Sequence, residues 1–140
     1  MADRHIDITI GQDIMAIKKI LSNDTKMNDL GYTADNIYQY NILDEELDKD
    51  SMYIILNTLT PKKINQGDTQ AIMIYGITIA AHRYKFDKVT DAVSRIQQLL
   101  HKKNISKFYH ELELYDPPTE VSTIPEMTMF IMTFSCYVTI

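Results

Sequence analysis

The stretch Glu126–Ile140, EMTMFIMTFSCYVTI, limits the folds that this chain can adopt. It has no charged residue after Glu126, and it contains neither glycine nor proline. Such a run of apolar, β-branched and aromatic residues favours a strand that is covered on both faces. Side chains alternate along a strand. One face would therefore carry Thr128, Phe130, Met132, Phe134, Cys136 and Val138. The other would carry Met127, Met129, Ile131, Thr133, Ser135 and Tyr137. An uncovered strand of this kind promotes aggregation. We therefore expect it to be buried in the chain's own core or against a second copy.

Two further apolar segments predict a β-hairpin. Met52–Thr60 and Thr69–His82 have the composition of strands. Pro61–Asp68, between them, contains a proline and a glycine and predicts a long hairpin tip. Gly76, in the middle of the second strand, indicates either a bulge or a close backbone approach.

Helical periodicity appears twice. Ile10, Ile14, Ile17 and Leu21 recur at helical spacing, and Thr9 with Gln12 has the spacing of a capping box. The second helix begins near Asp87, which we expect to cap it. Its apolar stripe consists of Val89, Ala92, Val93, Ile96, Leu99 and Leu100.

The remaining segments are less regular. Residues 22–51 are polar and predict an irregular, insertion-like segment, with room for one short helix. Phe108–Tyr115 alternates like a strand, with His110, Leu112 and Leu114 on one face, and Asp116-Pro117-Pro118 is expected to end it. The order is then α-β-β-α-β-β in a single domain, 1–140. It predicts an α+β fold: an antiparallel or mixed sheet with two main helices packed on one face.

Composition excludes several classes of protein. The chain has 140 residues, 45% of them hydrophobic and 24% charged, as in ordinary globular proteins. A formal net charge of -5 argues against a dedicated nucleic-acid binder. The single cysteine, Cys136, rules out a disulfide within the chain and favours a reducing compartment. We expect neither a signal peptide nor a membrane span, because the apolar runs are too short.

The chain shows no motif for catalysis, for a cofactor or for a metal. The four histidines, His5, His82, His101 and His110, form no HxxxH or HExxH pair. Cys136 lies within an apolar strand, where burial is the simpler role. The acidic stretch Asp44–Asp50 lacks the central glycine and the final glutamate of a calcium loop. The prediction is therefore a non-enzymatic protein with no cofactor.

The order and character of these segments resemble a known family. The passage ITIAAHRYKFDKVTDAVSRIQQLL, at 77–100, and the final strand TMFIMTFSCYVTI carry most of the likeness. Together with the hairpin and the proline-rich loop, they resemble the small tail terminator, or tail completion, proteins of long-tailed bacteriophages and phage-tail-like particles. The likeness extends over most of the chain from residue 10 onward.

This resemblance implies a structural role in virion assembly. Such a protein forms a homohexameric ring that terminates the tail tube and joins the tail to the head or neck, in a virion assembled in the bacterial host cytoplasm. Its partners are its own copies, the tail tube protein, and sheath or neck proteins, while DNA passes through the ring without specific binding.

Three other functions are consistent with the sequence. One is a head-to-tail connector or neck protein, and another is a small non-catalytic ligand-binding α+β domain. The third is an enzyme with a dispersed site around His82, His110 and Glu111. For the ring, we expect two contact surfaces, the hairpin tip and the second face of the final strand: Pro61, Lys62, Lys63, Ile64, Asn65, Gln66, Gly67, Asp68, Met127, Met129, Ile131 and Tyr137.

Overall fold

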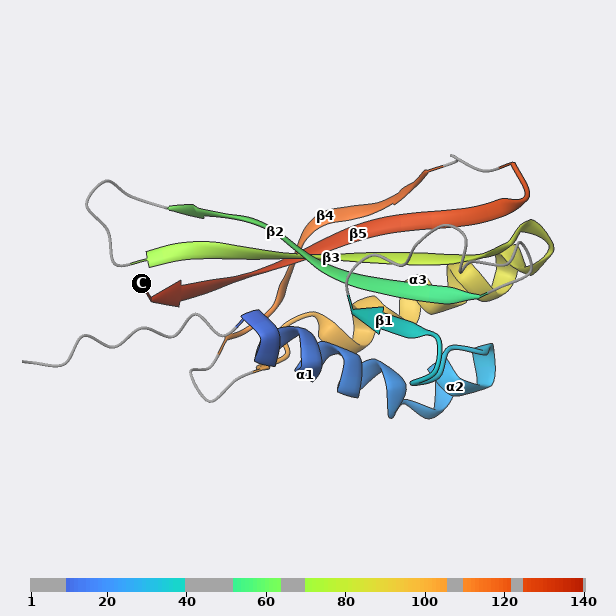
Figure 1. Cartoon of the computed structure of the whole chain (residues 1–140), viewed down its shortest axis with the longest axis horizontal. Helices are drawn as coiled ribbons and strands as arrows, with labels where there is room; N and C mark the ends of the chain where they lie inside the picture. The colour runs from blue at the N-terminus through green and yellow to red at the C-terminus, as the bar shows by residue number, and fades with distance from the viewer. Residues whose placement is uncertain (1–9, 40–51, 64–69, 106–109, 122–124, 140) are drawn as a thin grey trace, which may run out of the picture.

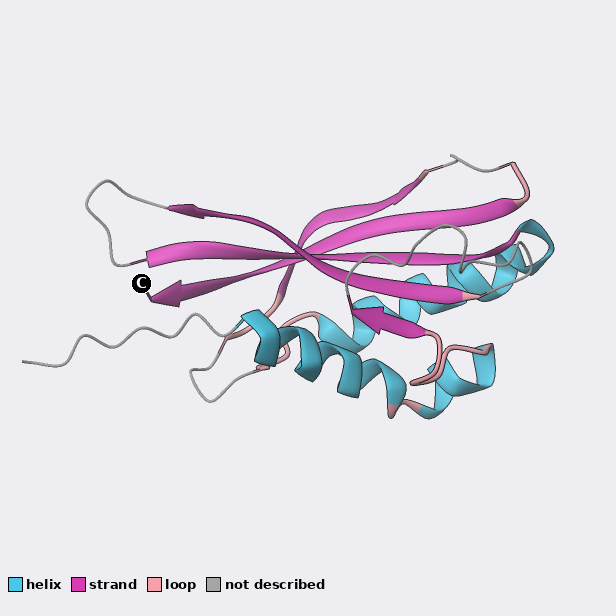
Figure 2. Ribbon diagram, in the orientation of Figure 1, coloured by secondary structure: helices cyan, strands magenta, loops and turns pink. Residues whose placement is uncertain are grey.

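The computed structural model describes residues 10–39, 52–63, 70–105, 110–121 and 125–139. In chain order the elements are α1 (Ile10–Ser22), α2 (Thr25–Leu30), β1 (Ile37–Gln39), β2 (Tyr53–Lys63), β3 (Gln70–His82), the 3-10 turn η2 (Arg83–Lys85), α3 (Phe86–Leu100), β4 (Glu113–Glu120) and β5 (Met127–Thr139). One mixed sheet has the strand order β1-β2-β3-β5-β4, and the helices lie on one side of it (Figures 1 and 2). The predicted α+β class is confirmed.

The three long strands form the centre of the sheet. β2 pairs antiparallel with β3, and β3 pairs antiparallel with β5 along its full length, from Gln70 opposite Thr139 to His82 opposite Met127. The final strand that the sequence predicted is β5, and it lies beside β3, the central strand of the sheet. Its helix-facing residues Met132, Phe134, Cys136 and Val138 are buried.

The helix stripes account for the core beneath the sheet. On α3, Val89, Ala92, Val93, Ile96 and Leu100 are buried, as the periodicity predicted. On α1, Ile14, Ile17 and Leu21 are buried. The capping prediction for α3 was wrong: Lys85 is at the N-cap without a side-chain bond, and Asp87 lies inside the first turn. The chain enters α3 directly from η2, so the helix starts earlier than Asp87. The predicted Thr9 cap of α1 lies outside the described residues.

Segment 22–51 contains more structure than its composition indicated. Asp24 caps α2 by accepting a hydrogen bond from the Met27 N–H at 3.0 Å, and Gly31 ends the helix with a left-handed φ of 110°. β1 then pairs with β2 in parallel, through Ile37 opposite Ile54, which makes the sheet mixed. The remainder of the segment, with Asp44–Asp50, lies outside the described residues.

The fourth strand is displaced from its predicted position. We expected Phe108–Tyr115 to end at Asp116-Pro117-Pro118, but β4 runs through both prolines to Glu120. β4 is an edge strand with an irregular register, a position that tolerates proline better than the middle of a sheet does. The register shifts on both sides of Asp116, whose N–H donates to Thr133 Oγ1 at 2.9 Å. The predicted alternation still holds, because His110 and Leu112 are buried and Glu111 and Glu113 are exposed.

Gly76 has neither the predicted bulge nor the predicted close backbone approach, because the atom next to it belongs to the side chain of Asn57. It pairs in register with Asn57 on β2 and with Thr133 on β5. A Cβ atom at position 76 would collide with Asn57 Oδ1. A shift of register does occur elsewhere in β2, between Leu59 and Lys62, around Pro61. Proline cannot donate to the ladder, so an irregularity at this point is expected.

Candidate functional site

The sheet face opposite the helices is the first candidate for an interaction surface. Along β5 it presents Met127, Met129, Ile131 and Tyr137, the four strand residues predicted to contact a partner. Tyr137 is 62% exposed and Ile131 is 37% exposed. Met129 is half-buried and Met127 is buried. The predicted surface therefore has accessible apolar side chains at two places: at Ile131, near its middle, and at Tyr137, near its end.

The buried end of this face has a small hydrophobic cluster of its own. Tyr53, Ala80 and Met127 form it, with Ile55 and Met129 packed against it. The cluster does not belong to the main core beneath the sheet, because its side chains lie on the opposite face of the sheet. This part of the outer face is thus closed, and Ile131 and Tyr137 remain as its exposed apolar residues on β5.

The predicted hairpin tip is described only in part. Pro61, Lys62 and Lys63 belong to β2, where Lys62 pairs with Ile72 and Lys63 with Ala71. Strand β2 thus begins one residue after the predicted start at Met52 and ends three residues beyond the predicted end at Thr60. The residues Ile64, Asn65, Gln66, Gly67 and Asp68 lie outside the described part of the chain.

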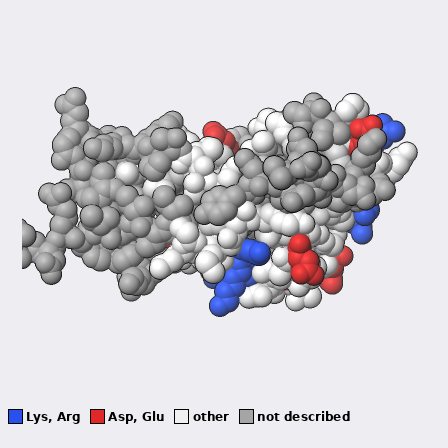
Figure 3. All heavy atoms as spheres, viewed as in Figure 1, with Lys and Arg blue, Asp and Glu red and all other residues white. Residues whose placement is uncertain are grey.

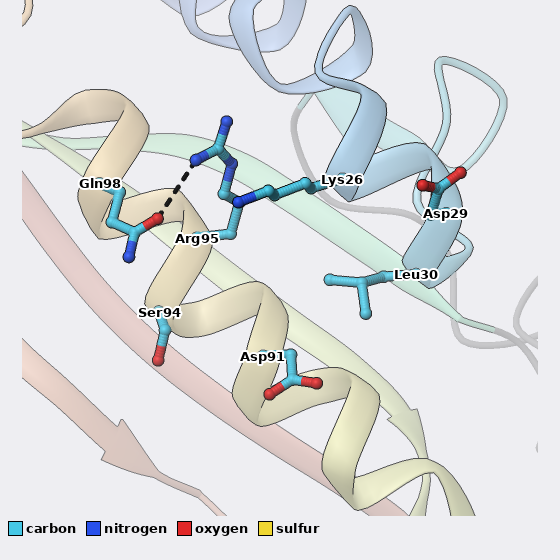
Figure 4. Close-up of a pocket in the computed structure, with 7 residues that line it drawn as sticks. All are labelled: Lys26, Asp29, Leu30, Asp91, Ser94, Arg95 and Gln98. Atoms are coloured by element: carbon cyan, nitrogen blue, oxygen red, sulfur yellow. Dashed lines mark hydrogen bonds between the residues drawn. The ribbon is translucent and has the colours of Figure 1, made fainter.

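A groove of about 390 Å³ between α2 and α3 is a second candidate (Figure 4). It is lined by Lys26, Asp29, Leu30, Asp91, Ser94, Arg95 and Gln98. Beside it, Arg95 Nη2 lies 2.7 Å from Asp24 Oδ1, and Arg95 Nε donates to Asp24 Oδ2 at 3.0 Å. The bidentate bond to Arg95 is the main reason why the pKa of Asp24 is lowered; burial opposes it. Both signs of charge line the groove, and Leu30 is its one aliphatic side chain, so it does not select an apolar ligand.

The third candidate is a buried polar cluster between α1 and the sheet. Tyr75 donates its hydroxyl hydrogen bond to Asp13 Oδ2 at 2.5 Å, and His110 Nδ1 lies 3.1 Å from the same oxygen. Cys136 of β5 lies beside them. All four residues are at most 2% exposed. Burial raises the pKa of Tyr75 well above its usual range, and the Asp13 hydrogen bond adds to the effect.

Asp13 was not predicted from the sequence as a member of this cluster. The available signal was its place three residues after Ile10 and next to Ile14, on the apolar stripe of α1. A carboxylate on a stripe that faces the core requires partners there. Those partners come from strand β3 and from the segment before β4, which are remote from Asp13 in the sequence, so local spacing could not identify them.

The dispersed enzyme site considered above is not assembled. His110 is buried, whereas the neighbouring Glu111 points to the surface. His82 Nδ1 accepts a hydrogen bond from the Tyr84 N–H at 3.3 Å at the end of β3. His101 Nδ1 accepts from the Leu114 N–H at 3.3 Å. Both of these histidines thus make local structural contacts, while His5 lies outside the described residues.

The charges on the visible surface are mixed. In Figure 3, basic side chains over α1 stand close to acidic side chains toward α2, within the part of the surface that belongs to described residues. The described part of that face therefore has no single sign of charge with which to hold a polyanion. Among the described helices, none is both long enough and apolar enough to span a membrane.

Comparison with known proteins shows a shared fold. No family model matches the sequence, and no curated protein does. A chain from the virion of a native gene transfer agent particle aligns with a TM-score of 0.70 and 13% identity, over 95% of this chain and 98% of that chain. A second solved structure aligns with a TM-score of 0.55 and 11% identity, over 95% of this chain and 96% of the other. In both cases the likeness covers nearly the whole of both chains.

Proposed function

We propose that this chain is a structural component of a phage-like virion, and that it acts at the end of the tail tube as a tail terminator. The observation that carries the proposal is the near full-length fold likeness to a chain of a gene transfer agent virion, with a TM-score of 0.70. The resemblance of the final strand and of the passage 77–100 to tail terminator proteins points to the same role.

In this proposal six copies form a ring that caps the tube and joins the tail to the head or neck. Ile131 and Tyr137 pack against a neighbouring subunit, which removes their exposed apolar surface from water. The β2–β3 hairpin tip, Pro61–Asp68, contacts the next subunit or the tube. The remaining partners are the tube protein and sheath or neck proteins, and the chain is located in the virion after assembly in the host cytoplasm.

Net charge supports passage of DNA without binding. Each chain has a formal net charge of -5, so a ring of six has about −30. Cationic walls would retain DNA through counterion release. A lumen without a continuous belt of Lys and Arg lets DNA slide through. The absence of a catalytic motif is in keeping with a purely structural protein.

Two experiments on the full chain test the ring. Light scattering after size exclusion, over a range of concentrations, measures its mass, and negative-stain imaging shows its shape. We expect six-fold rings, alone or on tail tubes purified from the particle. The double variant Ile131→Lys, Tyr137→Lys should stay monomeric with unchanged circular dichroism. Tyr84→Lys is the matched control, because Tyr84 is 82% exposed and lies on η2. A wild-type chain that is monomeric both alone and with tubes would contradict the proposal.

The alternatives predict different outcomes. A head-to-tail connector would bind the portal side and not the tube, and immunogold labelling of particles with detached heads separates the two. A ligand-binding domain would be a monomer whose melting temperature rises with a small molecule. The groove between α2 and α3 is the feature that favours this reading, since its volume of about 390 Å³ is adequate for a small ligand.

A further inference from the structure

Three metal-ligating side chains from distant parts of the sequence converge in the core. Asp13 comes from α1, His110 from the segment before β4, and Cys136 from β5. Each offers one ligand atom, and these atoms all lie within 4.8 Å of one another. The residues are 0%, 1% and 2% exposed, respectively. A chance surface grouping of acidic residues does not have this depth or this mixture of donor types.

The donor set has the chemistry of a zinc-class site. A carboxylate oxygen, an imidazole nitrogen and a thiolate sulfur are all common ligands of Zn²⁺, and Co²⁺ accepts the same ligands. The charge also balances: the carboxylate and the thiolate together neutralise a divalent cation, and the imidazole binds in its neutral form. A neutral complex is what a buried position tolerates, since an unbalanced charge there is costly.

The surroundings of Asp13 add a second observation. The Tyr75 hydroxyl donates to Asp13 Oδ2 at 2.5 Å, which fixes the orientation of the carboxylate. Hydrogen bonds of this kind to a ligating carboxylate are typical of metal sites. Tyr75 lies on β3, the strand that pairs with β5, and is itself buried.

We propose that Asp13, His110 and Cys136 bind one divalent cation of the zinc class. Binding releases the proton of the Cys136 thiol to solvent, because the thiolate is the ligand. Three protein ligands leave the fourth position of a tetrahedral site to one water molecule, and the burial of all three residues favours a structural role. The site would tie the first helix to the last strand and stabilise the folded chain by mass action.

The test uses the full chain, because none of its parts is known to fold alone. The protein is unfolded with denaturant and chelator and is then refolded with one equivalent of Co²⁺, so that burial does not block entry. Wild type should show the absorption of a Co²⁺–thiolate complex and one bound ion per chain. After refolding with Zn²⁺ its melting temperature should rise above that of the chelator-treated protein.

Three variants interpret the result. Cys136→Ser, which is close in size, should fold without metal but lose the thiolate absorption and the Zn²⁺-dependent melting shift. His82→Gln and His101→Gln are controls for binding at surface histidines and should behave like wild type. A folded wild-type protein with no thiolate absorption would overturn the proposal. Equal binding by wild type and Cys136→Ser would also overturn it, and would leave the cluster as a hydrogen-bond network only. These readouts do not depend on ring formation.

Discussion

The Tyr75 hydroxyl on β3 donates a buried hydrogen bond of 2.5 Å to Asp13 Oδ2 on α1, across 62 residues of sequence. It joins the first helix directly to the middle of the sheet. Since His110 contacts the same oxygen at 3.1 Å, the carboxylate links three separate parts of the chain. One polar residue within an apolar stripe therefore ties α1 to the sheet, in addition to the buried contacts of Ile14, Ile17 and Leu21.

Removing Tyr75 or removing Asp13 should destabilise the metal-free protein by different amounts. Tyr75→Phe removes one hydrogen bond and leaves the carboxylate with His110, so we expect a loss of about 1–3 kcal/mol. Asp13→Ala leaves two buried groups without their acceptor and should cost about 3–5 kcal/mol. Urea unfolding in chelator measures both. The double variant should cost less than the sum, because the two residues share one interaction. If the losses of the two single variants simply add in the double variant, the hydrogen bond between Tyr75 and Asp13 contributes nothing to stability.

Substitution of Gly76 should be harmful because of one neighbour. A Cβ atom at that position would collide with Asn57 Oδ1. We expect Gly76→Ala to cost about 1–3 kcal/mol by thermal or urea unfolding, the usual range for overpacking. In an Asn57→Ala background the same change should cost little or should stabilise, since alanine restricts the unfolded chain more than glycine does. An equal loss in both backgrounds would mean that the cause lies elsewhere.

Asp24 has two roles that can be separated. It caps α2 through the Met27 N–H, and it pairs with Arg95 of α3. Asp24→Asn keeps a good capping residue and loses the ion pair, whereas Asp24→Ala loses both and should cost about 1 kcal/mol more at neutral pH. Arg95→Gln keeps the cap and loses the pair, together with the hydrogen bond from Arg95 to Gln98 Oε1, and is the second comparison. Chemical unfolding gives the differences.

The same pair predicts a dependence on pH. The pKa of Asp24 is lowered in the folded state from its ordinary value of 3.8, chiefly by the bond to Arg95. The carboxylate therefore binds a proton less readily when folded. Its contribution is complete above pH 3.8 and is lost as the pH falls through the lowered folded value. The stability gap between wild type and Asp24→Asn should be constant near neutrality and should close in acid. A stability difference that became larger below pH 3.8 would contradict the role given to the Asp24–Arg95 pair.

The two prolines of β4 should protect the sheet edge. Pro117 and Pro118 lie within an edge strand and cannot donate backbone hydrogen bonds to another chain. Pro117→Thr with Pro118→Val restores both donors, so we expect faster concentration-dependent aggregation by light scattering. Pro125→Ser, in the turn before β5, is the control and should not change the rate. Equal aggregation of all three proteins would show that the edge is protected in another way.

Several elements were predictable because their signals are local. Strand β5 was identified by its unbroken apolar run, and α3 by its apolar stripe. The β2–β3 hairpin followed from two strand-like segments around a proline and a glycine. Short or irregular elements were not found. β1 has three residues and forms through its pairing with β2, and β4 crosses two prolines because it lies at the edge.

By itself the sequence determined that this chain is an α+β domain, with a two-faced apolar strand in its sheet and an amphipathic helix packed beneath it. Those properties follow from periodicity, which is a relation between near neighbours in the chain. The tertiary structure decided what periodicity cannot express. The strand order β1-β2-β3-β5-β4 leaves Ile131 and Tyr137 exposed on the outer face. Packing of α1 beneath the sheet brings Asp13 to His110 and Cys136. Both results depend on contacts between segments far apart in the chain, and only the folded arrangement brings those segments together.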